Sequence, residues 1–341
     1  MKRKKIAPMT KAERIAAAIR GEAVDRVPYS LWSYLPMIDL DPAANAEHTY
    51  DFYKTYDVDI LKTMNSGMYS VEDFGVTVDY SDIERGGVAK IISTPVHTPE
   101  DWLKVKPVSL HEGALAREQD YLKRLLKKTN GEVPVIFTVF SPLTTANKLC
   151  PHMMEHIASS HGEQVKAALT AITETTCALV QRVIELGADG IFFATQLSSY
   201  DLVKEELYKE YGMPYDVAVL SASQGWCNVL HAHGKHIMFP LLRKYPVQIF
   251  NWHAFESLPG IHEAQVMTGK CIMAGLERMD ITDGHKNEIE HQIYETLRET
   301  GGRHVILSPG CVIRYPLDPD MLFFVRKAKE EIETKLLVTG D

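Results

Sequence analysis

The stretch Leu186-Gly-Ala-Asp-Gly190 joins two segments of opposite character, and this junction decides the expected fold. Residues Gln164–Glu185 before it have the length and apolar spacing of an amphipathic helix, and Gly190–Ala194 after it is a short apolar run. Thr300-Gly-Gly-Arg303 marks the same change of character before the apolar run His304–Leu307. A helix that ends in a glycine turn just before a buried strand is typical of a parallel α/β sheet.

Outward from this junction, short apolar runs alternate with longer amphipathic segments along most of the chain. The runs predict strands at Val27–Trp32, Val58–Lys62, Val135–Phe140, Gly190–Ala194, Asn228–His231, Val247–Asn251, Cys271–Ala274 and His304–Leu307. The intervening segments predict helices that include Gln164–Glu185, Lys204–Trp226, Asn287–Thr300 and Asp320–Lys335. Eight strand–helix units predict an α/β fold of the (β/α)8 TIM-barrel type. An open doubly wound sheet is the alternative, although no G-x-G-x-x-G follows the first strand.

Two further segments complete the expected organisation. Thr10 and Glu13 form a capping box that starts an N-terminal helix, and Gly21 ends it. Residues 74–92 interrupt the alternation and predict a small antiparallel excursion with its turn at Gly86-Gly87. We therefore expect a basic tail at residues 1–9, which contains Lys2-Arg3-Lys4-Lys5, followed by one barrel domain at residues 10–341.

Composition excludes several classes of protein. The 341 residues are 45% hydrophobic and 24% charged, and the formal net charge is −8. An acidic balance argues against nucleic acid or an anionic membrane as the main partner, and no apolar run is long enough to cross a bilayer. The five cysteines are widely spaced without a C-x-x-C pair, which is typical of free thiols in a reducing compartment. We expect a cytoplasmic enzyme.

The polar side chains at two strand ends suggest a metal site. His231 and His233 are two residues apart at the end of the fifth predicted strand, so they point to the same side. Cys311 follows the eighth strand, and the carboxyl ends of barrel strands surround one mouth. Two imidazoles and one thiolate form a three-ligand zinc set with an open fourth position. The alternative is two hydrogen-bonding histidines beside a buried cysteine.

A rival metal motif, His152-Met-Met-Glu155-His156, matches H-x-x-E-H, but a surface helix is the preferred interpretation. Further candidates follow the predicted strands. We expect Tyr34, Gln196 and His253 to act in catalysis by orienting the substrate. The predicted substrate-binding residues are Trp32, Asn65, Trp252, Arg278 and Arg314. The two arginines would pair with a substrate carboxylate or phosphate, or else with the chain's own acids.

The opening E-R-I-A-A-A-I-R-G-E-A-V-D-R-V-P at residues 13–28 resembles the N-terminal signature of the uroporphyrinogen decarboxylase superfamily. Gly187-Ala-Asp-Gly-Ile191, His231-Ala-His-Gly234 and Ser308-Pro-Gly-Cys-Val312 follow in the order seen there, and the resemblance spans about residues 10 to 330. It implies a (β/α)8 barrel. One branch of the superfamily decarboxylates uroporphyrinogen without a cofactor, and the other contains zinc methyltransferases that work with corrinoid proteins.

This sequence differs from both branches at residues that determine their chemistry. The decarboxylase branch has an arginine-rich segment where this chain has residues 32–39, which contain no arginine, and an aspartate where this chain has Asn65 or Ser66. The methyltransferase branch binds zinc through H-x-C and a later P-G-C. Here the matching residues are His231, His233 and Cys311, so a histidine replaces one thiolate. A less negative zinc polarises its ligand more strongly, whereas a sulfur-rich zinc leaves a bound thiolate more nucleophilic, so the exchange favours an oxygen or nitrogen substrate over a thiol acceptor.

The resemblance therefore implies a zinc-dependent methyltransferase or demethylase that acts on a small methylated substrate, with a corrinoid carried by a partner protein. Glu256 and Gln196 are candidates for a fourth zinc ligand. The second interpretation is a decarboxylase of a carboxylated substrate, which would need no corrinoid partner. The third is a non-catalytic barrel that binds a tetrapyrrole or corrinoid. The superfamily also permits a homodimer.

Overall fold

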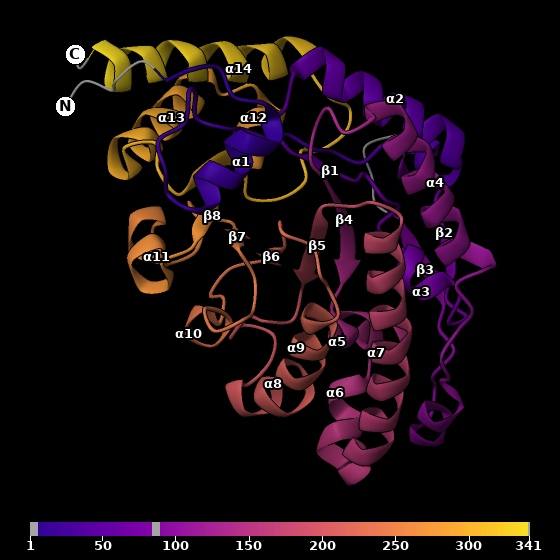
Figure 1. Ribbon diagram of the computed structural model, residues 1–341. Coiled ribbons are helices and arrows are strands. Elements are labelled where there is room, and N and C mark those ends of the chain that lie inside the picture. The colour runs from indigo at the N-terminus through magenta and orange to yellow at the C-terminus, as the bar shows by residue number, and fades with distance from the viewer. Residues whose placement is uncertain (1–5, 84–88, 340–341) are drawn as a thin grey trace.

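The computed structural model describes residues 6–83 and 89–339, and a curled sheet of seven parallel strands forms its centre (Figure 1). The strands are β1 Leu61–Lys62, β4 Val135–Phe140, β5 Gly190–Thr195, β6 Val229–Ala232, β7 Ile249–Trp252, β8 Cys271–Leu276 and β9 Val305–Pro309. Their order in the sheet follows their order in the chain. A doubly wound sheet would reverse direction at a switch point, so that alternative is wrong and the predicted strand–helix alternation is confirmed.

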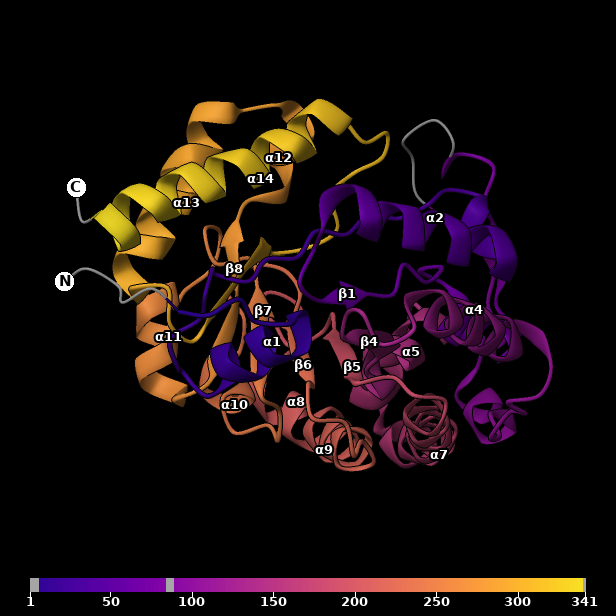
Figure 2. The same ribbon diagram turned by 45° about the horizontal axis from the view of Figure 1, so that its top comes forward.

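The helices surround this sheet on its outer side (Figure 2). The α-helices are α1 Lys11–Ile19, α2 Pro42–Tyr56, α3 Tyr69–Glu72, α4 Gly113–Thr129, α5 Pro142–Leu149, α6 Met153–His156, α7 Gly162–Glu185, α8 Glu205–Tyr211, α9 Met213–Ser221, α10 Phe239–Leu242, α11 Ile261–Thr268, α12 Arg278–Asp283, α13 Lys286–Thr300 and α14 Pro319–Glu333. Shorter 3-10 and π segments are η1 Ile38–Leu40, η3 Pro99–Lys104, η4 Ile157–His161 and η5 Thr334–Thr339.

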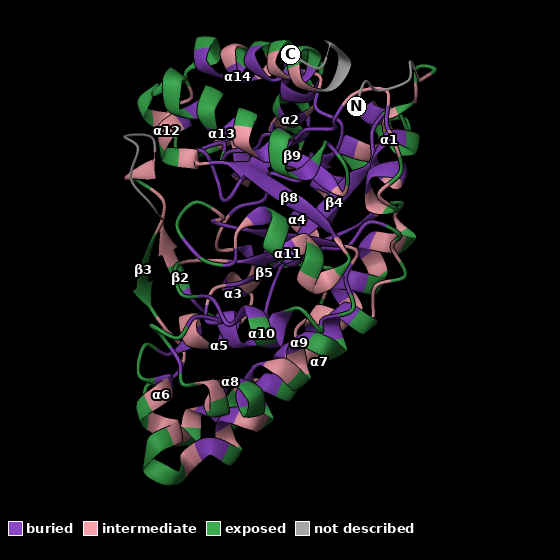
Figure 3. Ribbon diagram, turned by 90° about the vertical axis from the view of Figure 1, so that its left-hand side faces the viewer, coloured by how far each residue is buried: buried purple, intermediate pink, exposed green. Residues whose placement is uncertain are grey.

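The strands and the helices differ in how deeply their residues are buried. The strands of the seven-stranded sheet are buried along their whole length, whereas the helices alternate buried and exposed residues (Figure 3). A strand covered on both faces needs a continuous apolar run, which is why the sequence shows short apolar segments rather than alternating ones. Within the described ranges, no helix combines the length and the apolar character needed to cross a bilayer.

One helix prediction is confirmed by the structure, and another is wrong. The capping box of α1 is confirmed, since Thr10 Oγ1 accepts from the Glu13 amide at 3.2 Å and Glu13 Oε2 accepts from the Thr10 amide at 2.8 Å. The single helix expected over Lys204–Trp226 is wrong, because α8 and α9 replace it with a break at Gly212. Pro214 lies two residues after the break and lacks the amide hydrogen that a continuous helix would use there.

The first expected strand, Val27–Trp32, is an extended segment rather than a regular strand. Its backbone forms isolated parallel bridges, including Tyr29 with Leu307 beside β9. Side chains replace other ladder bonds: the Tyr29 amide donates to Asp59 Oδ2 at 3.1 Å, and Ser30 Oγ donates to the Ile60 carbonyl at 2.8 Å. These competing side-chain bonds explain why an apolar run of strand-like composition lacks a continuous ladder.

The predicted antiparallel excursion is present as a separate two-stranded sheet. Strand β2, Thr77–Asp79, pairs antiparallel with β3, Lys90–Ser93. The expected turn at Gly86-Gly87 lies outside the described residues, as does the basic cluster Lys2-Arg3-Lys4-Lys5.

Candidate metal centre and substrate cavity

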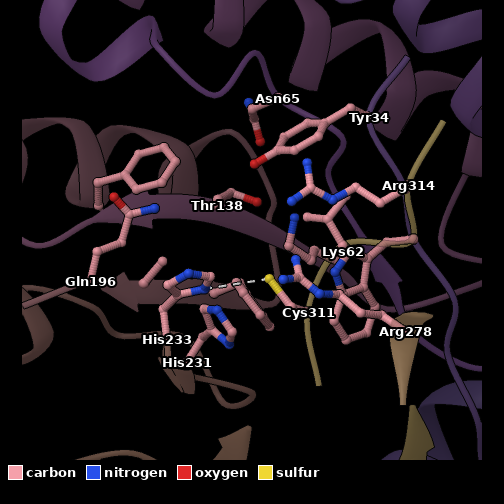
Figure 4. Close-up of a pocket in the computed structure, with 15 residues that line it drawn as sticks. Tyr34, Lys62, Asn65, Thr138, Gln196, His231, His233, Arg278, Cys311 and Arg314 are labelled. Carbon is pink, nitrogen blue, oxygen red and sulfur yellow. Dashed lines mark hydrogen bonds between the residues drawn. The ribbon is translucent and has the colours of Figure 1, made fainter. Parts of the chain in front are cut away.

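Three histidines and a cysteine converge where the strands β6, β7 and β9 end. The potential ligand atoms of His231, His233, His253 and Cys311 all lie within 4.8 Å of one another. Cys311 Sγ lies 3.6 Å from His233 Nδ1 (Figure 4). Because His231 pairs with Asn251 across β6 and β7, the residues two positions later, His233 and His253, are also brought together.

Gly310 lets the cysteine loop approach the end of β7. A Cβ atom at this position would lie 2.8 Å from both the Trp252 carbonyl oxygen and the His253 Cα. Both contacts are with backbone, which cannot swing away as a flexible side chain could. A larger residue at Gly310 would therefore push Cys311 away from the histidines.

Hydrogen bonds orient two of the histidine rings. Asn251 Nδ2 donates to the carbonyls of Met273 and Pro309 at 2.6 and 3.1 Å, so its Oδ1 must accept from His231 Nδ1 at 2.5 Å. His253 Nδ1 donates to Glu256 Oε1 at 2.9 Å. In both rings this network assigns the hydrogen to Nδ1 and leaves Nε2 as a free electron-pair donor.

The electrostatics of the four side chains favour a thiolate. Burial alone would raise the pKa of Cys311, but the adjacent His231, His233 and His253 outweigh it and hold the pKa well below its usual range. Burial lowers the pKa of the His231 imidazole. For His253, burial opposes the charged form, but the contacts with Cys311 and Glu256 raise the pKa above its usual value.

This donor set suits zinc. His253 Nε2 is buried without a hydrogen-bond partner among the described residues, which is costly unless a ligand or a metal uses its electron pair. Zinc bonds of 2.0–2.3 Å in a tetrahedron place the ligand atoms about 3.5 Å apart, close to the observed sulfur–nitrogen distance of 3.6 Å. The residues present fit a bound zinc ion.

A cavity of about 210 Å³ opens beside these residues (Figure 4). Its lining consists of Trp32, Tyr34, Lys62, Asn65, Thr138, Phe140, Phe192, Ala194, Gln196, His231, His233, Arg278, Cys311, Val312 and Arg314. Three of these are cationic, and no aspartate or glutamate occurs among these lining residues. A second cavity of about 310 Å³ shares Tyr34, Gln196 and Arg314 with the first.

The structure brings most of the predicted site residues to this cavity. Its walls include the predicted Trp32, Tyr34, Asn65, Gln196, Arg278 and Arg314. Trp252 is elsewhere: its ring packs 5.7 Å from that of Phe239, and its indole N–H donates to the Ser257 carbonyl at 3.1 Å. In a strand neighbouring residues point to opposite sides, so Trp252 faces away when Asn251 and His253 face the site.

Two expectations about individual ligands change. His253, expected to orient substrate, lies among the potential metal ligands instead. Glu256, considered as a fourth ligand, bonds to the far nitrogen of His253. Neither Arg278 nor Arg314 has an ion-pair partner in residues 6–83 or 89–339.

Sequence reasoning missed Lys62, which lines the cavity from the end of β1. A lysine that ends an otherwise apolar strand is the signal that could have found it, because strand ends supply the functional residues of barrels. The rival motif is not a metal site in the described residues. His152 bonds to Glu155 at the surface, and His156 Nδ1 accepts from the Trp102 indole at 3.0 Å.

Comparison with known proteins places the chain in a family. The uroporphyrinogen decarboxylase (URO-D) family profile matches residues 10–332. A methylcobamide:CoM methyltransferase of Methanosarcina acetivorans is 24% identical over 229 residues, which cover 62% of this chain and 66% of that protein. The match thus spans just under two thirds of that relative. A methylated-thiol–coenzyme M methyltransferase of Methanosarcina mazei is 24% identical over 351 residues, covering 95% and 90% of the two chains.

The solved structure of a methyltransferase from Methanosarcina mazei has the same fold. It superposes with a TM-score of 0.81 at 18% sequence identity, and the alignment covers 95% of this chain and 99% of that one. At this identity the likeness concerns the fold alone. The profile match, which covers almost the whole chain, confirms the resemblance found in the sequence: this chain belongs to the uroporphyrinogen decarboxylase family.

Proposed function

We propose that this chain is a methyltransferase that moves a methyl group between a small substrate and a corrinoid carried by a partner protein. The observation that carries the proposal is the convergence of His231, His233, His253 and Cys311 beside one cavity. The names of the relatives support it, since they describe methyl transfer involving methylcobamide and coenzyme M. We further propose that the enzyme works in the cytoplasm, as the five free cysteines suggest.

His231, His233 and Cys311 would hold zinc, and the free Nε2 of His253 is the candidate for a fourth donor. Bound zinc would supply a Lewis acid that polarises the heteroatom gaining or losing the methyl group. With three nitrogen donors and one sulfur, the set is less electron-rich than a sulfur-rich site. It therefore suits a methylated oxygen or nitrogen compound.

The chain's own residues would bind and orient the substrate. A heteroatom that loses a methyl group to the corrinoid keeps the bonding electron pair and gains negative charge. Lys62, Arg278 and Arg314 make the potential of the whole cavity positive, which favours a substrate that becomes more negative as it reacts. Tyr34 and Gln196 offer hydrogen bonds to the substrate, and the aromatic walls formed by Trp32, Phe140 and Phe192 restrict water.

We also infer that residues 27–33 complete an eight-stranded (β/α)8 barrel. The Ser30 amide donates to the Leu307 carbonyl at 2.9 Å, and the Asp59 amide donates to the Tyr29 carbonyl at 2.9 Å. The segment thus bonds to residues at both edges of the seven-stranded sheet. The cavity would then lie at the mouth of the barrel, where a corrinoid protein could approach it.

Decarboxylation of uroporphyrinogen fits the cavity less well. The NH groups of its pyrroles need an anion, and the described residues lining the cavity include no carboxylate. Asn65 is present there instead, and its amide donates to Glu118 Oε2 at 2.8 Å. A decarboxylase of another substrate is the alternative outcome of the experiment.

The test combines zinc content with methyl transfer. Wild type, His233→Ala, Cys311→Ser and the control Cys177→Ser, on helix α7, are analysed for zinc and for demethylation of free methylcobalamin with methyl acceptors of different classes. We expect about one zinc per chain and activity in wild type and control, and loss of both in the two site variants. Zinc-free wild type that gains no activity on adding zinc contradicts the proposal, and carbon dioxide release that survives a chelator favours decarboxylation.

A further inference from the structure

Lys62 is a buried lysine in the wall of the cavity. It ends strand β1, is 5% exposed, and lines the cavity beside Cys311. Its ammonium group donates to the Thr63 carbonyl at 3.1 Å and lies 5.0 Å from the centre of the Phe192 ring and 5.9 Å from that of Trp32. No carboxylate within the described ranges forms an ion pair with it. Burial accordingly lowers the pKa of Lys62 to about 7.

Two other inward-facing cations, Arg14 and Arg117, are paired with carboxylates. Arg14 bonds to Asp25 and Asp59 at 2.7 Å each, and Arg117 bonds to Glu72 at 2.9 Å and Glu118 at 3.1 Å. Burying a charge is costly unless an opposite charge compensates it. Lys62 faces the cavity and has no such carboxylate in the described ranges, which suggests that the missing counter-charge belongs to a ligand.

Two more cations share the cavity with Lys62. Arg278 Nε is buried and lacks a hydrogen-bond partner in the described part of the chain. Arg314 lines both cavities and, like Arg278, has no ion-pair partner within the described ranges. Figure 4 shows the three cationic side chains on the Cys311 side of the cavity, away from Gln196. The three together form a cationic wall beside the Cys311 thiolate, with no carboxylate among the described lining residues.

We propose that the substrate carries a carboxylate or sulfonate group, and that Lys62 binds this anion with the help of Arg278 and Arg314. The reacting heteroatom would lie at the three histidines and Cys311, so the substrate is bound at two points within one cavity. This inference rests on the proposed function for the reacting end of the substrate, but the anion site itself does not depend on the chemistry. Lys62 thereby determines specificity for anionic over neutral compounds.

A purely structural role for Lys62 can be separated from this one. Lys270 has a similar environment: its ammonium donates to the Tyr245 carbonyl at 2.5 Å and lies 5.3 Å from the centre of the Phe250 ring. Lys270 does not line the cavity. Lys270→Met is therefore a matched control for Lys62→Met, because both replace a lysine packed over an aromatic ring and hydrogen-bonded to a carbonyl.

The experiment measures binding by calorimetry with probes of equal length and different charge. The probes are 3-methoxypropanoate, 2-methoxyethanesulfonate and the neutral 3-methoxypropanamide, and the proteins are wild type, Lys62→Met and Lys270→Met. Each titration is run on the protein as purified and after a chelator has been applied and removed. The second arm separates binding to Lys62 from binding of the anion to a metal.

We expect wild type to bind at least one anion about tenfold or more tightly than the amide, as charge-assisted hydrogen bonds allow. Lys62→Met should lose that preference in both arms with little change for the amide, and Lys270→Met should keep it. The two anions show which acid group the site prefers. Equal binding of anion and amide by wild type, a preference that survives in Lys62→Met, or no binding at millimolar concentration overturns the proposal.

The failure of this proposal is distinguishable from that of the proposed function. A protein without methyl-transfer activity that still shows the Lys62-dependent preference retains the anion site and loses the methyltransferase assignment. A protein that transfers methyl groups but binds anion and amide equally retains the assignment and loses the anion site.

Discussion

Glu256 Oε1 lies 2.9 Å from His253 Nδ1, and this contact leaves the second nitrogen of His253 free beside Cys311. The far oxygen of Glu256 lies 3.8 Å from Lys235 Nζ, so the carboxylate is itself held in place. A carboxylate on the outer nitrogen of a histidine fixes its tautomer and makes it a stronger metal donor. The pair behaves as a support for the candidate metal centre.

Replacing Glu256 by glutamine should weaken zinc binding without abolishing it. The amide removes the negative charge that supports His253, and such a change lowers metal affinity by about 10–100-fold. Competition with a chromogenic chelator measures the effect. Glu263→Gln, an exposed change on α11, is the control and should bind zinc as wild type does. Equal affinities in the two variants would show that His253 does not ligate the metal.

Cys311 should be the first cysteine to react with iodoacetamide near pH 7 in chelator-treated protein. The three adjacent histidines overcome its burial and lower the pKa, so Cys311 stays a reactive thiolate at a pH where an ordinary thiol is protonated. Burial raises the pKa of Cys150, Cys177, Cys227 and Cys271, which keeps these thiols protonated.

Peptide mass spectrometry after timed alkylation identifies the modified cysteine. Added zinc should protect Cys311 and leave the slow reaction of the others unchanged. Modification of all five at similar rates in folded protein would refute the lowered pKa.

Asp216→Asn should make the protein less sensitive to alkaline pH. Asp216 is buried on α9, its Oδ2 accepts from Tyr208 and Tyr245 at 2.7 and 2.9 Å, and burial raises its pKa to about 7 from 3.8. The folded state therefore keeps this proton to higher pH than the unfolded state. The resulting stabilisation is complete below about pH 4 and is lost as pH rises towards 7.

Urea unfolding at pH 4.5 and 8 measures this change. The decline in the free energy of unfolding should be about 2–4 kcal/mol smaller in Asp216→Asn than in wild type. Asp120→Asn, which alters an exposed pair with Arg124, should follow the wild-type curve. If the free energy of unfolding declined between pH 4.5 and 8 by the same amount in Asp216→Asn as in wild type, Asp216 would be ionised in the folded protein.

Lys62→Met should stabilise the ligand-free protein. The folded pKa of about 7 lies below the unfolded value of 10.5, so at and below pH 7 the folded state bears the cost of a buried charge. That cost is recovered as pH rises from 7 towards 10.5. We expect the variant to be about 1–4 kcal/mol more stable at pH 6.5, and the difference to shrink at pH 9.5.

Urea unfolding at the two pH values tests this expectation, with Lys270→Met as the control because Lys270 is only half-buried. A less stable Lys62→Met at pH 6.5 would show that the ammonium group contributes to the fold, contrary to the functional role proposed for it.

The amino-acid sequence by itself determined the strand–helix alternation, seven of the eight strand positions, and the convergence of His231, His233 and Cys311. These features follow from local patterns, since helix and strand periodicities and glycine turns act over a few residues. The sequence could not show that Val27–Trp32 lacks a continuous strand ladder. The Tyr29 amide bonds to the side chain of Asp59, which is distant in the sequence, and the Ser30 side chain bonds to a backbone carbonyl.

Only the tertiary structure decided which nearby residues face the cavity. His253 joins the potential ligands whereas Trp252 faces away, because the register of β7 against β6 sets which side each residue occupies. The absence of a carboxylate beside Lys62 in the described ranges likewise depends on which segments pack around the end of β1. Periodicity fixes the spacing along one strand, but pairing between strands and the placement of opposite charges arise only when the segments pack together and the sheet curls.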